Sequence, residues 1–372
     1  MKVRVFIGFI LFGWLFGMLS ACSRIWNPIE LLSQIEEPQK YAIINMAWSP
    51  DGKKLALTVK SLPQTPDIFP ENDYHQHYLI HTDGASLKKI PLIASDTSPL
   101  FFWVSSERFV LNNGTTYQLN YLGQPQFISD SGYKTHVLSH MCSLTPSQDL
   151  LIQGRVNNPQ GRTSEFFTPG LFMKKESEYQ QILPLQFQTT ADFEAPNTLS
   201  GTALACSPFS NRIYLEFSSG THDAKAQHHL LAELDIEKKQ VLNPTRFYSL
   251  DPPSDPMIPR EMLHFLGWKD ENRIYYAVQK SAPESEKKVI VYDYDLTTHT
   301  STELKNISPP ILLAIQNHVS FAFSPDLTQV AFVEKKTQKL MLSDLQGKTI
   351  KTLLDIPIAL AEQNQDLNRL KF

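Results

Sequence analysis

The sequence has 372 residues, of which 42% are hydrophobic and 19% are charged, and its net charge is −4. This composition is typical of a globular protein with enough apolar material for a substantial core. No run of basic residues stands out, so the chain lacks the electrostatic footprint of a nucleic-acid-binding protein. Its 25 prolines against 15 glycines, with many short aromatic and β-branched runs, favour strands and turns.

The first predicted element is an apolar N-terminal segment. Two basic residues precede an apolar stretch at 5–18, which suits a secretory signal and is shorter than the ~20 residues that cross a bilayer as a helix. The stretch ends in Leu-Ser-Ala-Cys at 19–22, which resembles the lipobox of bacterial lipoproteins. The resemblance implies cleavage before Cys22, acylation of Cys22 and, because Ser23 follows, sorting to the outer membrane. A plain signal peptide, or an anchor helix, with an incidental cysteine is the alternative.

Beyond this segment the sequence repeats one pattern six times. Each copy has two apolar strands around a small polar turn and, after a variable stretch, an extended run closed by an Asp, Gly or Asn turn. The first halves lie at 46–59, 101–113, 141–154, 204–217, 265–278 and 321–334. The second halves lie at 78–90, 116–128, 171–183, 230–242, 289–304 and 340–354. Alternation such as that at 54–59 is typical of half-buried antiparallel strands.

Six four-stranded units predict a β-propeller. A lone sheet of four strands cannot bury both faces, whereas six sheets arranged radially bury each face against a neighbour. We therefore expect an all-β chain with a signal peptide at 1–21, a lipidated linker at 22–40, a six-bladed propeller at 41–357 and a tail at 358–372. Only this tail shows a helical period. The ring is expected to be closed by residues 28–45 or by the tail, and a two-layer β-sandwich is the alternative fold.

Two of the copies resemble a known family. The phrases WSPDGKKLAL at 48–57 and FSPDLTQVAF at 323–332 are similar to the WD-like propeller repeat of TolB-type proteins, which also occurs in the N-terminal domains of prolyl-oligopeptidase-like enzymes. The resemblance spans 41–354 and implies the same propeller architecture. The recurring Ser-Pro-Asp is itself a turn signal, because proline presets the backbone and aspartate bonds back to it.

No catalytic motif accompanies the repeats. The sequence lacks a nucleophile elbow, a zinc-protease motif, a P-loop, a dinucleotide-binding loop and a C-x-x-C pair. The short stretch after Leu354 leads us to expect no appended hydrolase domain. Two histidine clusters are interpreted as polar loops, the first leading into a strand, although strand spacing at 75 and 77 would also suit zinc. The clusters comprise His75, His77 and His81, and His222, Asp223, His228 and His229.

Asp293 and Asp295 are interpreted as turn residues that close an outer hairpin, as are the matching Asp235 and Asp344. After lipidation of Cys22, Cys142 and Cys206 remain. They fall on first strands of adjacent copies but two positions out of register, and such strands are expected to lie too far apart to be bonded. We therefore predict two buried free thiols, although an oxidising envelope permits a disulfide.

Binding is expected in the long excursions, because loops on a rigid scaffold carry recognition residues. Aromatic side chains dominate interface hot spots, and the candidates for partner binding are Phe69, Tyr74, Phe166 and Phe167. We expect a lipid-anchored protein-binding scaffold that faces the periplasm and holds an envelope protein, without catalytic residues, metal, cofactor or nucleic acid. The alternatives are a metal-dependent, lactonase-like hydrolase and a sensor that binds a small ligand or glycan in the central funnel. The apolar or small first-strand residues count against the hydrolase.

Overall fold

A computed structural model describes most of the repeat region. The described residues are 40–62, 75–83, 87–90, 101–111, 115–129, 138–145, 147, 149–157, 167–175, 178–184, 186–187, 197–199, 203–219, 226–252, 261–280, 288–316, 320–334 and 337–355. The predicted signal peptide, Cys22 and the C-terminal tail lie outside these residues. No helix within them is both long and apolar enough to cross a bilayer.

Twenty-four of the strands form six four-stranded units. In blades 1 to 3 they are β1 (Lys40–Trp48), β2 (Lys54–Leu62), β3 (His75–His81), β4 (Leu87–Lys89), β5 (Phe101–Trp103), β6 (Arg108–Leu111), β7 (Thr116–Leu119), β8 (Pro125–Ser129), β9 (Leu138–Ser143), β10 (Leu150–Asn157), β11 (Phe167–Lys175) and β12 (Glu178–Pro184). In blades 4 to 6 they are β15 (Leu204–Cys206), β16 (Arg212–Ser219), β17 (Ala226–Asp235), β18 (Gln240–Leu250), β19 (Met262–Asp270), β20 (Arg273–Lys280), β21 (Lys288–Asp295), β22 (Thr300–Glu303), β23 (Phe321–Phe323), β24 (Gln329–Glu334), β25 (Lys339–Asp344) and β26 (Ile350–Asp355).

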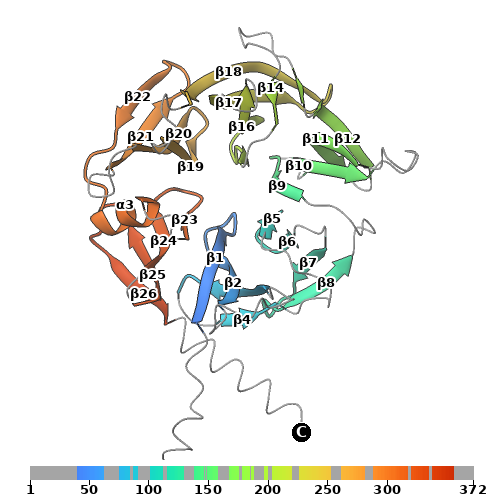
Figure 1. The fold of residues 1–372 in the computed structure, drawn as a ribbon. Helices are drawn as coiled ribbons and strands as arrows, with labels where there is room; N and C mark the ends of the chain where they lie inside the picture. Colours follow the sequence, from blue (N-terminus) through green and yellow to red (C-terminus); the bar gives the residue numbers. More distant parts are fainter. Residues whose placement is uncertain are drawn as a thin grey trace, which may run out of the picture.

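The six units are arranged radially as an all-β, six-bladed propeller (Figure 1). Within each blade the four strands are antiparallel and follow in chain order, with the first strand nearest the axis. A short extra hairpin, β13 (Gln186–Phe187) and β14 (Asn197–Thr198), extends the fourth sheet and was not predicted. The predicted all-β, six-bladed propeller is confirmed, and the alternative of a two-layer β-sandwich is wrong.

The core consists of six clusters, and each cluster joins two neighbouring blades. Blades 1 and 2 share one cluster, blades 2 and 3 the next, and so on around the ring. The last cluster packs β1, β2 and β3 of blade 1 against β24 and β25 of blade 6. Each blade therefore buries its two faces against different neighbours, which is the physical reason for closing a circle.

Within the described residues the ring closes by packing of blade 1 against blade 6. Every blade takes its four strands from its own copy, and residues 40–45 belong to β1 of blade 1. Across the seam the Ser320 hydroxyl donates to the carbonyl of Ile43 at 2.5 Å, and Lys351 Nζ donates to the carbonyl of Asp83 at 2.7 Å. Both expected ways of completing a blade, by residues 28–45 or by the tail, are therefore absent from the described part of the ring.

The recurring Ser-Pro-Asp phrase builds the turn between the first two strands. The Ser49 hydroxyl donates to the Asp51 carboxylate at 2.6 Å and accepts from the Lys54 amide at 2.9 Å. Ser324 makes the same two bonds in blade 6. Gly52 takes the left-handed backbone position with φ 68°, as the turn requires.

One helix, α3 (Pro309–Gln316), was not predicted. It connects blade 5 to blade 6 and buries Ile311, Ala314 and Ile315 in the cluster between them. Its sequence, PPILLAIQ, is apolar almost throughout and therefore shows no one-sided stripe. Pro309 stands at the first helical position, where its fixed backbone angle favours the start of a helix.

Candidate functional site

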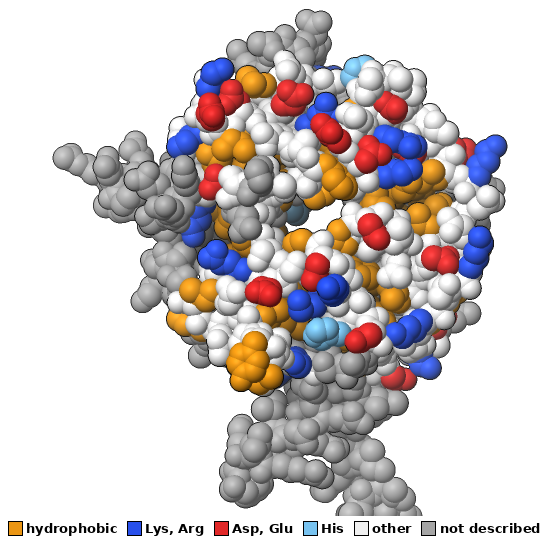
Figure 2. Space-filling model, turned by 180° about the vertical axis from the view of Figure 1, so that it is seen from behind, with side chains coloured by type: hydrophobic (Ala, Val, Ile, Leu, Met, Phe, Trp, Pro, Cys, Tyr) orange, Lys and Arg blue, Asp and Glu red, His pale blue; other side chains and the backbone are white. Residues whose placement is uncertain are grey.

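A cavity of about 610 Å³ lies on the propeller axis. All six blades line it, with the ends of their first strands and the turns that follow. Figure 2 shows the hollow at the centre of the ring, with hydrophobic side chains around it. The site is thus assembled from six short segments that are spread over most of the chain.

None of the lining residues that the structure describes is charged. The polar side chains among them are hydroxyls, and the remainder is aromatic, aliphatic, methionine, proline, glycine or cysteine. The hydroxyl residues are Ser105, Ser106, Ser143, Thr145 and Ser324. A concave apolar surface with a few hydroxyls suits an uncharged or apolar group.

The same lining is poorly suited to a metal. Zinc requires nitrogen or sulfur ligands and calcium requires several oxygens, usually from carboxylates. Among its described lining residues there is no carboxylate or imidazole, and no group of three His, Cys, Asp or Glu side chains within the described ranges is placed to hold a metal.

The strand registers define one equivalent position near the end of each first strand, which we name the anchor. Each anchor pairs with the residue at, or next to, the start of the second strand. The pairs are Trp48 with Leu55, Trp103 with Phe109, Ser143 with Leu150, Cys206 with Ile213, Trp268 with Ile274 and Phe323 with Val330. Alignment of the sequence copies places Leu144 at this position in blade 3, so that alignment is wrong by one residue.

We name the residue immediately before each anchor the pre-anchor. In blades 1 and 2 the anchor side chain bonds to the pre-anchor of the preceding blade. Trp48 Nε1 of blade 1 donates to the carbonyl of Ala322 of blade 6 at 2.9 Å. Trp103 Nε1 of blade 2 donates to the carbonyl of Ala47 of blade 1 at 3.0 Å. Trp268 has no such bond: its side chain is 3% exposed, and its Nε1 is buried without a hydrogen-bond partner.

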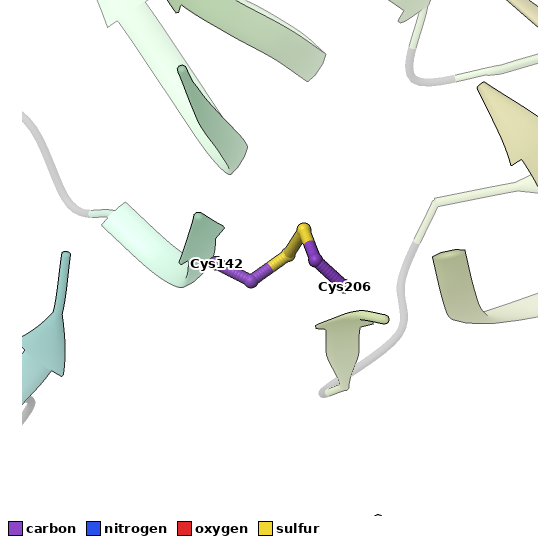
Figure 3. Close-up of a disulfide and its surroundings, with 2 residues drawn as sticks. All are labelled: Cys142 and Cys206. Atoms are coloured by element: carbon purple, nitrogen blue, oxygen red, sulfur yellow. A yellow bond between two sulfur atoms is a disulfide. The ribbon is translucent and has the colours of Figure 1, made fainter. Parts of the chain in front are cut away.

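A disulfide joins Cys142 and Cys206, so the prediction of two free thiols is wrong (Figure 3). The two Cα atoms are 5.5 Å apart, within the range that a disulfide needs. Cys142 is the pre-anchor of blade 3 and Cys206 is the anchor of blade 4. The offset between them is one residue rather than two, and this offset is what a contact between neighbouring first strands requires. The expectation failed because of the misplaced Leu144.

The described members of the two predicted histidine clusters lie on strands. His77 lies on β3, with its Nδ1 2.9 Å from the Thr58 hydroxyl. His228 and His229 lie on β17, so interpreting them as a loop was wrong. His229 Nδ1 is 2.7 Å from the Tyr214 hydroxyl, and burial, with a smaller effect from the charge of His228, lowers the pKa of His229 to about 3. The remaining members of that cluster, His222 and Asp223, lie outside the described residues.

The predicted turn aspartates are confirmed with one exception. Asp235, Asp295 and Asp344 each accept a hydrogen bond from a backbone amide of the turn that follows. Asp293 instead lies within β21, is 4% exposed and pairs with the Arg273 guanidinium. Its interpretation as a turn residue is wrong, because the outer hairpin closes two residues later.

The side chains of the predicted partner-binding residues are not placed by the described part of the chain. Phe69, Tyr74 and Phe166 lie outside the described residues, and Phe167 begins β11 with its side chain undescribed. Sequence reasoning missed the cavity residues because no local motif marks them.

No protein-family model matches the chain, and no curated protein matches its sequence. Among solved structures, a puromycin-hydrolyzing peptidase of Mycobacterium tuberculosis is 9% identical over 85% of this chain and 52% of its own, with a TM-score of 0.45. Hydrazine synthase of Kuenenia stuttgartiensis is 9% identical over 84% and 79%, with a TM-score of 0.42. A putative 6-phosphogluconolactonase from Bacteroides uniformis is 9% identical over 83% of both chains, with a TM-score of 0.38. The chain thus spans about half the length of the peptidase, and likenesses this low decide nothing about activity.

Proposed function

We propose that this protein is a lipid-anchored, non-catalytic scaffold that binds a partner protein in the bacterial cell envelope and receives a segment of that partner in the axial cavity. The observation that carries the proposal is the uncharged, largely apolar lining that all six blades contribute. Such a lining supplies contact area and a few hydroxyl groups for orientation, and it supplies no acid, base or metal ligand for chemistry.

Rigidity supports binding at this position. Each blade is held by apolar clusters on both faces, and the seam between blades 3 and 4 is covalently closed beside the cavity. A site that is already formed loses little conformational freedom when a partner enters, so more of the contact energy appears as affinity. The ring therefore suits a recognition surface better than a moving catalytic one.

Lipidation of Cys22 is proposed from the sequence at 19–22. A thiol is the group that carries a thioether-linked diacylglycerol, and two or three acyl chains on one residue hold a protein firmly at a bilayer. The resemblance to TolB-type propellers supports the periplasmic side of the envelope. Replacing Cys22 by serine should move the protein from the membrane fraction to the soluble periplasm, whereas retention of unprocessed protein in the membrane would contradict the lipobox assignment.

Partner binding in the cavity is tested by blocking it. Ser143→Arg places a long cationic side chain where the half-buried serine lines the cavity, and Ser147→Arg places the same side chain on the exposed surface of the same blade. Affinity capture from detergent-solubilised membranes should recover a partner with the wild type and with Ser147→Arg but not with Ser143→Arg. Capture that is unchanged by Ser143→Arg, or no specific partner for any form, would contradict the proposal.

A further inference from the structure

Exposed apolar side chains gather at the outer edge of blade 2. Nine large hydrophobic residues are exposed within the described part of the chain, and four of them lie between positions 121 and 128. We name these four residues the blade 2 rim. They are Tyr121, Leu122, Phe127 and Ile128, with exposed fractions of 94%, 54%, 49% and 45%. A concentration of this kind marks an interaction surface more often than isolated exposed residues do.

Blades 4 to 6 partly bury the residue that blade 2 exposes. The turn between the third and fourth strands begins with Asn120 in blade 2, whose side chain accepts two amide hydrogens of the turn. The residue that follows is Tyr121 in blade 2, and its counterparts are Ile236, Leu296 and Leu345 in blades 4 to 6. Each of these counterparts packs against a core cluster between blades. The exposure of Tyr121 is therefore a departure from the repeat.

Strand β8 presents its apolar residues rigidly. The pairing of β7 and β8 shifts register at Ile128, and such a bulge turns a strand locally and can expose consecutive side chains. Phe127 ends a row of aromatic rings that crosses the blade, with centroids 5.2 Å apart for Phe109 and Tyr117 and 6.2 Å apart for Tyr117 and Phe127. The row fixes Phe127 in place although about half of it is exposed.

The rim is uncharged, and cations predominate among the described charged residues around it; Asp130, the next charged residue after β8 in the sequence, lies outside the described residues. Residues 115–129 contain no charged side chain, whereas the outer hairpin of every other blade does. Lys88 Nζ of blade 1 donates to the carbonyl of Leu122 at 2.6 Å. Arg108 is exposed on the side that faces blade 3, in the same cross-strand row as Gln118 and Gln126. Burial lowers the pKa of Lys174, and the nearby positive charge of Arg108 lowers it further. Glu107 is the acidic residue of the adjoining turn.

We propose that the blade 2 rim is a docking surface for a segment of a partner protein that carries apolar side chains flanked by carboxylates. Apolar groups of the segment cover Tyr121, Leu122, Phe127 and Ile128, and its carboxylates face the surrounding cations. Charge complementarity of this kind sets orientation and specificity, while the aromatic centre supplies the affinity. The inference extends the scaffold function by adding a second contact surface, remote from the axial cavity, with a stated partner chemistry.

Site-specific photo-crosslinking tests this proposal with the full-length protein in the cells that make it. Phe127 is replaced by p-benzoylphenylalanine, and Ile350, an apolar residue with 48% exposure on outer strand β26, receives the same replacement as the matched control. Irradiation should link position 127 to one discrete partner and leave position 350 unlinked. Peptide mapping of the product should identify a segment with apolar residues flanked by Asp or Glu.

The charge requirement has its own variants. Arg108→Glu, combined with the crosslinker at position 127, should lower the crosslink yield about tenfold, and Arg108→Lys should retain most of it. Equal yields at positions 127 and 350, a basic or uncharged partner segment, a lipid adduct, or a link to a second copy of this chain would each overturn the proposal. Because Ser143→Arg tests the axial cavity separately, failure at the rim and failure of the scaffold function are distinguishable.

Discussion

Replacing Cys142 and Cys206 together by serine removes a covalent link between two neighbouring blades. The linked residues are 64 positions apart. Closing a loop of that length in the unfolded chain costs about 14 cal/mol/K, so the disulfide stabilises the fold by about 4 kcal/mol. With an unfolding entropy of about 2 cal/mol/K per residue over roughly 300 folded residues, the expected loss is about 7 °C in Tm.

Thermal unfolding followed by circular dichroism measures this difference. The double serine variant should melt about 7 °C below the wild type, and a dithiol reductant should lower the Tm of the wild type but not that of the variant. Non-reducing peptide mapping verifies that the wild type contains the Cys142–Cys206 link. Equal melting temperatures for the linked wild type and the variant, or free thiols at both positions, would refute the reasoning.

Four further variants probe single interactions. Trp48→Phe removes a hydrogen bond from blade 1 to blade 6 and should lower the free energy of unfolding by about 1–2 kcal/mol. Trp268→Phe removes an indole N–H that has no acceptor, so the loss measured by urea denaturation should be smaller. The pKa of His229 in the folded protein is about 3, so its contribution to the free energy of unfolding is complete above pH 6.5 and is lost as the pH falls from there towards 3. His229→Gln should therefore reduce the loss of unfolding free energy between pH 7 and pH 5, measured by denaturation at both pH values. Asp293→Asn leaves its cationic partners without a carboxylate and should cost about 2 kcal/mol of unfolding free energy, measured in urea.

The repeat pattern was enough to predict the architecture. The alternating strands, the Ser-Pro-Asp turn at Ser49 and the turn aspartates could be predicted because their hydrogen bonds and patterns involve residues only a few positions apart in the sequence. Closure then follows, because a ring lets each of the six units bury both faces against its neighbours. Helix α3 escaped prediction because a helix buried on several sides loses the polar stripe that marks amphipathic helices.

The candidate site was harder to predict, because it depends on register between blades. The pairing of Cys142 with Cys206 follows from a one-residue offset that imperfect turn similarity conceals in blade 3. The axial cavity combines residues that are far apart in the sequence and share no motif, and they meet only when the ring forms. The sequence instead favoured loops rich in aromatic residues as binding sites, because composition can be read without knowing the register between blades.

A designed disulfide at the ring closure tests the arrangement of equivalent blades most directly. Trp48 is the anchor of blade 1 and Ala322 is the pre-anchor of blade 6, so they correspond to Cys206 and Cys142. The double variant Trp48→Cys with Ala322→Cys should form a disulfide under oxidising conditions, visible as a linked peptide by mass spectrometry. The shifted pair Ala47→Cys with Ala322→Cys should remain reduced. Absence of the first link, or equal formation of both, would contradict a closed ring of six blades in a common register.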